Sequence, residues 1–522
     1  MKKIGIMILG AGVMQLPAYE AAQRNNWSVI AADGNAQAPC RNKADLFLHI
    51  DLKDRIGLAE AAEEIKDKMN IQGVFTCGTD FSTSVAWIAE KLNLPGISYQ
   101  TALDCTDKYR MRKKFSENNI PSPGFCELSV DMDFVKSVAK LEYPLVVKPV
   151  DNMGGRGVIT VPDEKSLDKA VNEAISFSRT GRAIAEEFMD GKEYSIDSLV
   201  ISQDEIIITG FADRHICYPP CFIEMGHTLP SELGNEETEN MFSVFKDAVK
   251  ALGITSGAAK GDIKLTSRGV MIGEIAARLS GGYMSGWTYP YASGVTLVEE
   301  GMKIALGIIP DKLDETINRT SSERAYLSIP GVIESLEGIE EAHEADEIKD
   351  LFILAEEGDR VYFPLNNVMK CGNVIAVADK REDALRASEK AVSRIRIGLR
   401  PGDTETQTFL EQDLETSFPP SAYKAEGWDS LEYLNDFKAD FSMQYKDSPI
   451  LIPSSDCLAF LSQKDWNSVI LERVLKEIEE SSDLIFSENA SWSLFSGHFW
   501  YALLRGGVQG ALWYIDNNDK EN

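Results

Sequence analysis

The sequence predicts a multidomain protein that combines α/β and α+β folds, and three observations carry this prediction. The 522 residues exceed the size of one ordinary core, so roughly three or four domains are expected. Short apolar segments alternate with helical patterns in the first 104 residues, and the composition changes after residue 400. With 44% hydrophobic and 26% charged residues, the composition is typical of a globular protein.

The first predicted domain, residues 1–104, is a doubly wound parallel sheet, because strands and helices alternate along it. The first apolar stretch follows two lysines, as in a signal peptide, but it is short and runs into a Gly-Ala-Gly turn, so we interpret it as a strand. The expected strands are Ile4–Leu9, Val29–Ala32, Leu46–Ile50 and Gly73–Cys77, and the expected helices are Leu16–Asn25, Ile56–Lys68 and Ser84–Leu92.

The second predicted domain, residues 105–318, begins with a basic helix at residues 107–114. Its expected strands are Pro144–Pro149, Ala183–Glu187, Tyr194–Ile201, Glu205–Phe211, Ala258–Leu265 and Val270–Ile275. A third, smaller α+β domain at residues 319–400 has expected strands Arg324–Ile329 and Asn373–Ala378 and an expected helix Arg381–Ile395. Residues 401–522 hold 8 basic and 22 acidic residues and five of the eight tryptophans, which predicts a separate acidic module of unknown role.

Charge and cysteine usage exclude several classes of partner and location. The net charge of −29 argues against nucleic acid or an anionic membrane as the main partner, and no apolar run approaches the roughly 20 residues that span a bilayer. Any bound polyphosphate must therefore meet a local group of cations and backbone amides. The eight cysteines form no CxxC pair, so we expect reduced thiols in a cytoplasmic protein.

The N-terminal glycines resemble a dinucleotide-binding turn. Gly10 and Gly12 follow the first strand, and Asp33 closes the next strand about twenty residues later. Gln15, however, occupies the place of the third glycine of that pattern, and the strand-to-helix turn needs glycines in any case. We therefore favour a structural or substrate-facing turn over NAD binding.

A lysine and a glycine-rich loop form a candidate phosphate site. Lys148 ends an apolar strand, and Gly154, Gly155 and Gly157 follow within ten residues. A cation at a strand end and the N–H groups of a flexible loop can together surround a triphosphate, and glycine lets the backbone approach closely. The alternative is a simple hairpin. Neither a GxxxxGK[ST] loop nor the kinase motifs occur in the chain.

Acidic residues follow at the next two strands. Glu186 and Glu187 end one strand, and Glu193 opens the strand after the turn. These carboxylates can accept hydrogen bonds from an adenine amine and from ribose hydroxyls. The alternative interpretation is a solvated hairpin.

A third feature is a predicted hairpin that places two carboxylates together. The strands on either side of the turn Thr266–Gly269 bring Asp262 and Glu274 near each other. Paired carboxylates are the hard oxygen ligands that magnesium prefers, while it keeps water and phosphate oxygens as further ligands. Arg278, two pleats beyond Glu274, can hold a phosphoryl group or a carboxylate; a structural ion pair with Glu274 is the alternative.

In this order, the motifs resemble those of the ATP-grasp superfamily. The collinear segments are TDKYRMRKKF, YPLVVKP, GGRGV, AEEFMDGKEYS, GDIK and GEIAARLSGG, which follow an N-terminal sheet. Within the superfamily the chain looks most like the carboxylate–amine ligases related to bacterial L-amino acid ligases, and more distantly like biotin carboxylase and purine-pathway enzymes. The resemblance covers residues 1–400 and implies a Rossmann-like pre-ATP-grasp domain, an ATP-grasp domain and a small ligase C-terminal domain.

The resemblance also implies roles for individual residues. Phosphates would be bound by Lys108 and Lys148 beneath the Gly154–Gly157 loop, adenine by Glu186, Glu187 and the backbone near Met189, and ribose by Glu193. Magnesium, or manganese in its place, would be held by Asp262 and Glu274. Arg278, with Lys148, would stabilise the transition state of acyl-phosphate formation. The residues expected to contact substrate are Arg214, Glu224, His227, Gly281 and Gly282.

Two local features qualify this assignment. Many superfamily members have asparagine two residues after the second metal-binding acid, where this chain has Ala276. The amino acid ligase branch often lacks that asparagine too, so we interpret Ala276 as a feature of the branch; a weakened second metal site is the alternative. His215, Cys217, Cys221 and His227 suggest zinc, but their spacing fits no usual zinc finger and two prolines stiffen the segment between them, so we do not expect zinc.

The expected activity is ADP-forming ligation of a carboxylate to an amine through an acyl phosphate. Two alternatives stay open: an ATP-grasp enzyme that carboxylates or formylates a nucleotide-pathway intermediate, and a nucleotide-binding scaffold without turnover. The expected partners are a small carboxylate and a small amine, which the sequence does not name. Family members often dimerise, so the resemblance suggests a homodimer.

Overall fold

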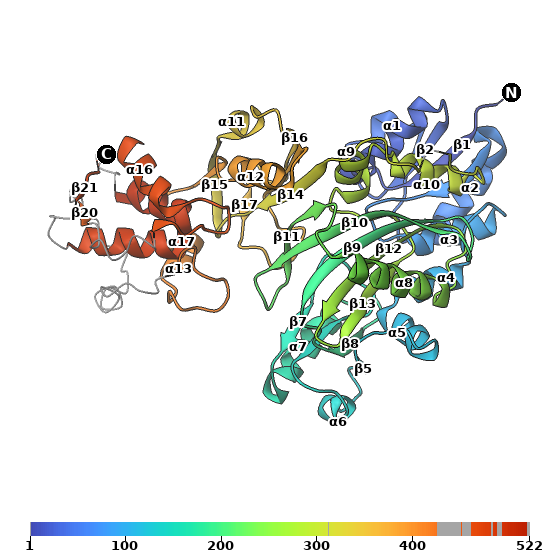
Figure 1. The fold of residues 1–522 in the computed structure, drawn as a ribbon, viewed down its shortest axis with the longest axis horizontal. Helices are drawn as coiled ribbons and strands as arrows, with labels where there is room; N and C mark the ends of the chain where they lie inside the picture. The colour runs from blue at the N-terminus through green and yellow to red at the C-terminus, as the bar shows by residue number, and fades with distance from the viewer. Residues whose placement is uncertain are drawn as a thin grey trace. The chain divides into compact units, whose positions relative to one another are not determined.

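The computed structural model describes residues 2–311, 313–424, 450–451, 461–481, 484–487 and 493–518 (Figure 1). The chain divides into two compact units. The first contains Met1–His215, His227–Ser322 and Ala378–Arg381, and the second contains Ile216–Gly226, Glu323–Val377 and Glu382–Asn522. The four predicted domains, with their three boundaries, stay predictions beside this coarser division.

The first unit begins with the predicted parallel sheet, which is confirmed. Its order is β3-β2-β1-β4, with parallel pairing throughout. The central strand β1 is wholly buried, as expected for a parallel sheet that is covered on both faces. The strands are β1 (Gly5–Leu9), β2 (Ser28–Asp33), β3 (Leu46–His49) and β4 (Ile71–Phe75), and the helices are α1 (Leu16–Arg24), α2 (Arg55–Met69) and α3 (Ser82–Lys91).

A smaller antiparallel sheet carries the glycine-rich loop. Its order is β5-β8-β6-β7, and the loop joins β6 (Leu145–Pro149) to β7 (Ile159–Val161). The helix α7 (Leu167–Phe177) packs its apolar face on this sheet and completes a separate core. The strand β8 (Arg182–Glu187) was predicted, whereas β5 (Phe125–Ser129) and β7 were not.

The first unit also contains four neighbouring antiparallel strands of a larger sheet, in the order β13-β12-β9-β10. These strands are β9 (Lys192–Val200), β10 (Ile206–Cys217), β12 (Gly257–Thr266) and β13 (Gly269–Ala276). The helix α8 (Asn235–Ala251) buries Met241 and Phe245 against them. The predicted hairpin is confirmed, because β12 and β13 pair with Asp262 opposite Glu274.

Further helices of the first unit, in addition to the short α6 (Phe134–Val138), lie between its strands along the chain. The predicted basic helix is α5 (Lys108–Glu117), which follows α4 (Tyr99–Thr106). Asp107 caps α5 by accepting hydrogen bonds from the backbone N–H groups of Tyr109 and Arg110. After β13 the chain forms a π-helical turn at Met284–Thr288, then α9 (Tyr289–Ser293) and α10 (Leu297–Ala305).

The second unit is built around one hydrophobic core. This core joins residues of the 325–400 region, such as Tyr326 and Val374, to aromatic residues near the C-terminus, such as Trp500 and Trp513. The strand predicted at Arg324–Ile329 begins earlier, as β14 (Thr320–Tyr326). The other elements are β15 (Gly331–Glu337), α11 (Ile339–His343), β16 (Ile348–Ile353), β17 (Arg360–Val361), β18 (Gly372–Ala378), α12 (Arg381–Val392), β19 (Arg396–Leu399), α13 (Thr404–Leu410), β20 (Ile450–Leu451), α16 (Leu471–Ser481), β21 (Phe486–Ser487) and α17 (Leu494–Asn518).

None of the helices in the part of the chain that the structure describes is long and apolar enough to cross a membrane.

Candidate active site

Lys148 is held by a buried carboxylate. Its Nζ lies 2.7 Å from Glu186 Oε2, while Arg112 Nε on α5 lies 2.9 Å from Glu186 Oε1. Glu186 is 2% exposed and Arg112 is 1% exposed. Burial alone would raise the pKa of Glu186, but Arg112 and Lys148 hold it below its ordinary value. Burial lowers the pKa of Lys148. Both oxygens of Glu186 thus face cations.

Lys108 connects the glycine-rich loop to the carboxylate pair. Its Nζ donates to the Asn152 carbonyl at 2.8 Å and lies 3.5 Å from Glu274 Oε2. Within the loop, Gly154, Gly155 and Gly157 have φ values of 70°, 78° and 70°. Because side chains rarely adopt this left-handed conformation, the path of the loop depends on glycine.

The two carboxylates of the hairpin lie among cations. Asp262 contacts Lys260 and lies 2.8 Å from Arg214. Burial would raise the pKa of Glu274, but Lys108, and then Lys260, Lys148 and Arg278, hold it at about 2. Glu274 is therefore ionised at neutral pH, as a cation ligand must be.

The predicted adenine and ribose residues lie next to this group. Glu193 pairs with Arg214, so Arg214 bridges Glu193 and Asp262. Lys264 Nζ donates to the Met189 carbonyl at 3.1 Å, and Glu187 forms an ion pair with Arg268 at 3.0 Å. The structure thus joins Glu193, Arg214 and Asp262 in one network of charged side chains, whereas Glu187 pairs separately with Arg268.

Arg278 lies beyond the end of its strand. The prediction placed it two pleats after Glu274, but β13 ends at Ala276, so the segment after the strand sets its position. Its Nη1 donates to the Leu279 carbonyl at 3.0 Å and its Nε lies 3.9 Å from Asp80. Among the described residues no ion pair joins Arg278 to Glu274, which contacts Lys108 instead.

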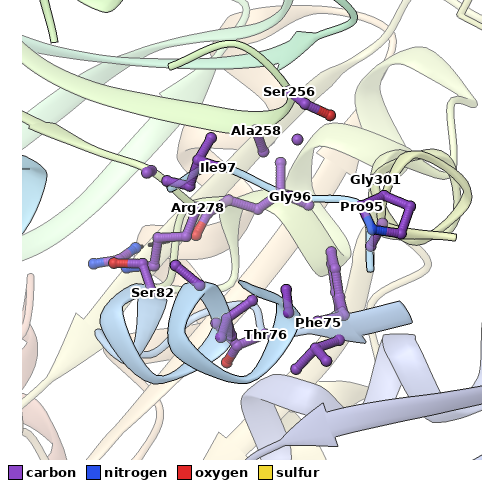
Figure 2. Close-up of a pocket in the computed structure, with 18 residues that line it drawn as sticks. Phe75, Thr76, Ser82, Pro95, Gly96, Ile97, Ser256, Ala258, Arg278 and Gly301 are labelled. Carbon is purple, nitrogen blue, oxygen red and sulfur yellow. Dashed lines mark hydrogen bonds between the residues drawn. The ribbon is translucent and has the colours of Figure 1, made fainter. Parts of the chain in front are cut away.

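A small apolar cavity of about 70 Å³ lies beside Arg278. Figure 2 shows the Arg278 side chain running along the cavity toward Ser82, with Ile97 and Ala258 on the wall. The lining comes from segments far apart in the sequence, including α3, β12 and α10. No local pattern in the sequence indicated it.

The glycine pair after Arg278 is fixed by a buried aspartate. Asp197, which is fully buried, accepts hydrogen bonds from Ser280 N at 2.9 Å and from Ser285 Oγ at 2.7 Å. These two serines flank Gly281 and Gly282, and Gly282 has a φ of 60°. Burial raises the pKa of Asp197. Sequence reasoning missed Asp197, because only its fold contacts distinguish it from other strand aspartates.

The other two expected substrate residues lie in different surroundings. His227, on β11 (Ile223–Leu229), is 2% exposed and its Nε2 lies 2.8 Å from Thr288 Oγ1. Glu224 belongs to the second unit, where its backbone N–H donates to Asn367 Oδ1 at 2.8 Å and its carbonyl accepts from Lys370. Their roles stay predictions.

Comparisons with known families match two parts of the chain. Residues 141–286 match the ATP-grasp domain, and residues 325–400 match the L-amino acid ligase C-terminal domain 2. These ranges fall within the second and third predicted domains. They also contain every predicted site residue except Lys108.

Curated proteins with similar sequences include an L-amino acid ligase. An uncharacterized protein, y4rH, of Sinorhizobium fredii is 25% identical over 337 residues, which cover 64% of this chain and 69% of that protein. The L-arginine-specific L-amino acid ligase of Bacillus subtilis is 24% identical over 308 residues, covering 54% and 73%. The chain spans about half the length of several other curated relatives.

The fold also matches a solved structure. The L-amino acid ligase of Bacillus licheniformis superimposes with a TM-score of 0.66 at 23% identity, over 77% of this chain and all of that one. Residues 141–286 therefore match an ATP-grasp domain and residues 325–400 match the C-terminal domain 2 of L-amino acid ligases, so the chain resembles the carboxylate–amine ligases of the ATP-grasp superfamily.

Proposed function

We propose that this protein is an ADP-forming ligase that phosphorylates a carboxylate with ATP and joins the acyl group to an amine. The observation that carries the proposal is the group around Glu274, in which the buried Lys108, the largely buried Lys148, a glycine loop and a pair of facing carboxylates converge. In a chain with a net charge of −29, such a concentration of cations suits a polyphosphate ligand.

ATP would bind between the small sheet and the β12–β13 hairpin. Lys108 and Lys148 would neutralise its phosphates, and the loop that contains Gly154, Gly155 and Gly157 would cover them. On the other side, the edge formed by Glu186, Glu187, Met189 and Glu193 would receive the adenosine. The ion pair with Lys148 gives Glu186 a further task, because it fixes the lysine that faces the phosphates.

The residues of the hairpin fit a magnesium ion. Asp262 and Glu274 supply oxygen donors from facing positions, and their side chains are 18% and 29% exposed, which leaves access for phosphate and water ligands. Manganese has similar ligand preferences. When bound, the metal would neutralise phosphate charge and orient the transferred group. Ala276, two residues after Glu274 on β13, is buried and offers no ligand atom for a second ion.

A carboxylate resists attack by an amine because its negative charge repels the nucleophile and oxide is a poor leaving group. Transfer of the γ-phosphoryl group of ATP replaces oxide with phosphate as the leaving group. This transfer needs positioning and neutralisation of charge rather than a protein nucleophile. We assign that work to Lys148 and to Arg278, whose guanidinium can hold the acid or the transferred phosphoryl group.

The amine then attacks the acyl carbon and phosphate leaves. The glycine loop would keep water from the acyl phosphate while it waits for the amine. The candidates for substrate contact are Arg214, Glu224, His227, Gly281 and Gly282, and His227 already has a hydrogen-bond partner within the fold. We further propose that the enzyme works in the cytoplasm and that it dimerises.

The test is ADP release from purified protein with and without magnesium, against amino acids and small carboxylates, singly and in pairs. Because the cavity beside Arg278 is small and apolar, the screen should begin with acids that carry short aliphatic chains. Release that requires both an acid and an amine supports the ligase. Release with bicarbonate or formate would instead indicate carboxylation or formylation. Nucleotide binding without turnover would indicate a scaffold.

A further inference from the structure

Arg112 is the most deeply buried charged residue next to the proposed nucleotide site, and the proposed function gives it no role. It lies on α5, four residues after Lys108, and it is 1% exposed. Burying a guanidinium costs free energy unless charge and hydrogen bonds compensate it. The partners of Arg112 therefore indicate what the residue does.

The first partner is Glu186 on β8. Arg112 Nε lies 2.9 Å from Glu186 Oε1, and Lys148 Nζ lies 2.7 Å from Oε2 of the same carboxylate. The carboxylate is thus held from both sides, so its orientation toward Lys148 depends on Arg112. Among the described residues this contact is a close ion pair rather than a directional hydrogen bond, because neither Arg112 Nε nor Glu186 Oε1 has a hydrogen-bond partner.

The second partner is a backbone carbonyl in the hairpin. Arg112 Nη2 donates to the Gly273 carbonyl at 2.6 Å. Gly273 is the extra residue of a β-bulge, because Asp262 pairs with Glu274 while the next residue, Ile263, pairs with Ile272. The bulge has no room for a side chain, since a Cβ at Gly273 would lie 2.9 Å from the Asp262 carbonyl oxygen. Arg112 therefore anchors the backbone immediately before Glu274.

We propose that Arg112 is a positioning residue that couples the phosphate-binding and metal-binding halves of the site. Through Glu186 it orients Lys148, and through Gly273 it holds the bulge that presents Glu274 opposite Asp262. The inference rests on the proposed function, because the proposed function assigns Lys148 to phosphate binding and Glu274 to metal binding. The inference adds that one side chain of α5, Arg112, fixes Lys148 and Glu274 relative to each other.

The two branches predict separable effects. In Arg112→Lys, the dissociation constant for ADP should rise about tenfold or more, and so should the magnesium concentration for half-maximal binding, because both anchors are weakened. In a Glu186→Gln background the ADP effect of Arg112→Lys should largely disappear, since Arg112 acts on Lys148 through Glu186. The magnesium effect should persist, because that branch runs through Gly273.

Nucleotide binding to the purified full-length chain, measured calorimetrically with ADP and a magnesium titration, gives both readouts without any acid or amine. The matched control is Arg110→Lys, two residues earlier on the same helix, where Arg110 is partly exposed and pairs with Asp104. That control should leave both constants unchanged. If Arg112→Lys does not fold, Arg112→Gln, which keeps a donor and removes the charge, should weaken ADP binding more than it changes the magnesium requirement.

A lowered unfolding temperature with unchanged ADP and magnesium constants would overturn the proposal and leave Arg112 a structural residue only. Additive effects of Arg112→Lys and Glu186→Gln on ADP binding would overturn the Glu186 branch. Failure of the proposed function looks different: the unmodified protein would bind no ADP, or would bind it and catalyse no ligation. In the second case the Arg112 result remains interpretable.

Discussion

Asp262 and Glu274 stand directly opposite each other on β12 and β13, next to a bulge at Gly273. Opposite residues of an antiparallel pair bring their Cβ atoms to about 5 Å, so one ion can contact both carboxylates. Around them lie Lys108, Lys260 and Arg214, each within 3.5 Å of a carboxylate oxygen. A metal ion with its phosphate ligands would balance these charges in a bound complex.

Replacement of Glu274 by glutamine should abolish most magnesium-dependent turnover. The amide keeps the size of the side chain and removes the charge, so it is a poor magnesium ligand. We expect ADP release to fall by about 100-fold or more, on the scale of a lost charge-stabilising group. The matched control, Glu239→Gln on the exposed face of α8, should retain full activity. Unchanged turnover in Glu274→Gln would refute its metal role.

Replacement of Lys148 by methionine should weaken ATP binding and leave the fold intact. Glu186 keeps its ion pair with Arg112, so a positive charge still balances the buried carboxylate in this variant. We expect the dissociation constant for ADP to rise by about tenfold to 100-fold, as for other lost contacts between charged groups. Calorimetric titration with ADP would measure this dissociation constant. The control is Lys140→Met, which replaces an exposed lysine. Equal affinities in the two variants would argue against the phosphate role.

The depressed pKa of Glu274 predicts a dependence of stability on pH. The folded pKa of about 2 lies below the ordinary value of 4.5, so the folded state favours the ionised form. The resulting stabilisation is fully present above pH 4.5 and is lost as the pH falls toward 2. The difference in unfolding free energy between wild type and Glu274→Gln should therefore change only below pH 4.5, in urea titrations. A difference that is constant from pH 6 to pH 3 would contradict the assignment.

Replacement of Asp197 by alanine should disturb the Gly281–Gly282 turn. It leaves Ser280 N and Ser285 Oγ without their shared buried acceptor, at a cost of about 2 kcal/mol or more. We expect a lower free energy of unfolding in denaturant titrations and a raised KM for the acid substrate. Asparagine keeps one acceptor oxygen, so Asp197→Asn should restore part of both. Equal behaviour of the two variants would show that the hydrogen bonds do not hold the turn.

The elements that the sequence predicted well are those set by local pattern. The β12–β13 hairpin needed only a tight turn between two apolar strands, and this placed Asp262 beside Glu274 without knowledge of the fold. The alternation of strands and helices likewise predicted the parallel N-terminal sheet, because each βαβ step must return to the same sheet. Element boundaries were less certain, as the early start of β14 shows.

By itself the sequence determined the order of the motifs, the classes of the sheets and the residue types that suit ATP and magnesium, because these follow from periodicity and side-chain chemistry. Only the tertiary structure decided which charges meet. Arg112 reaches Gly273 across 161 positions of the chain, and Asp197 reaches Ser280 across 83. Such pairs leave no local signal, since burial in a shared core, not spacing along the chain, brings them together and makes their hydrogen bonds necessary.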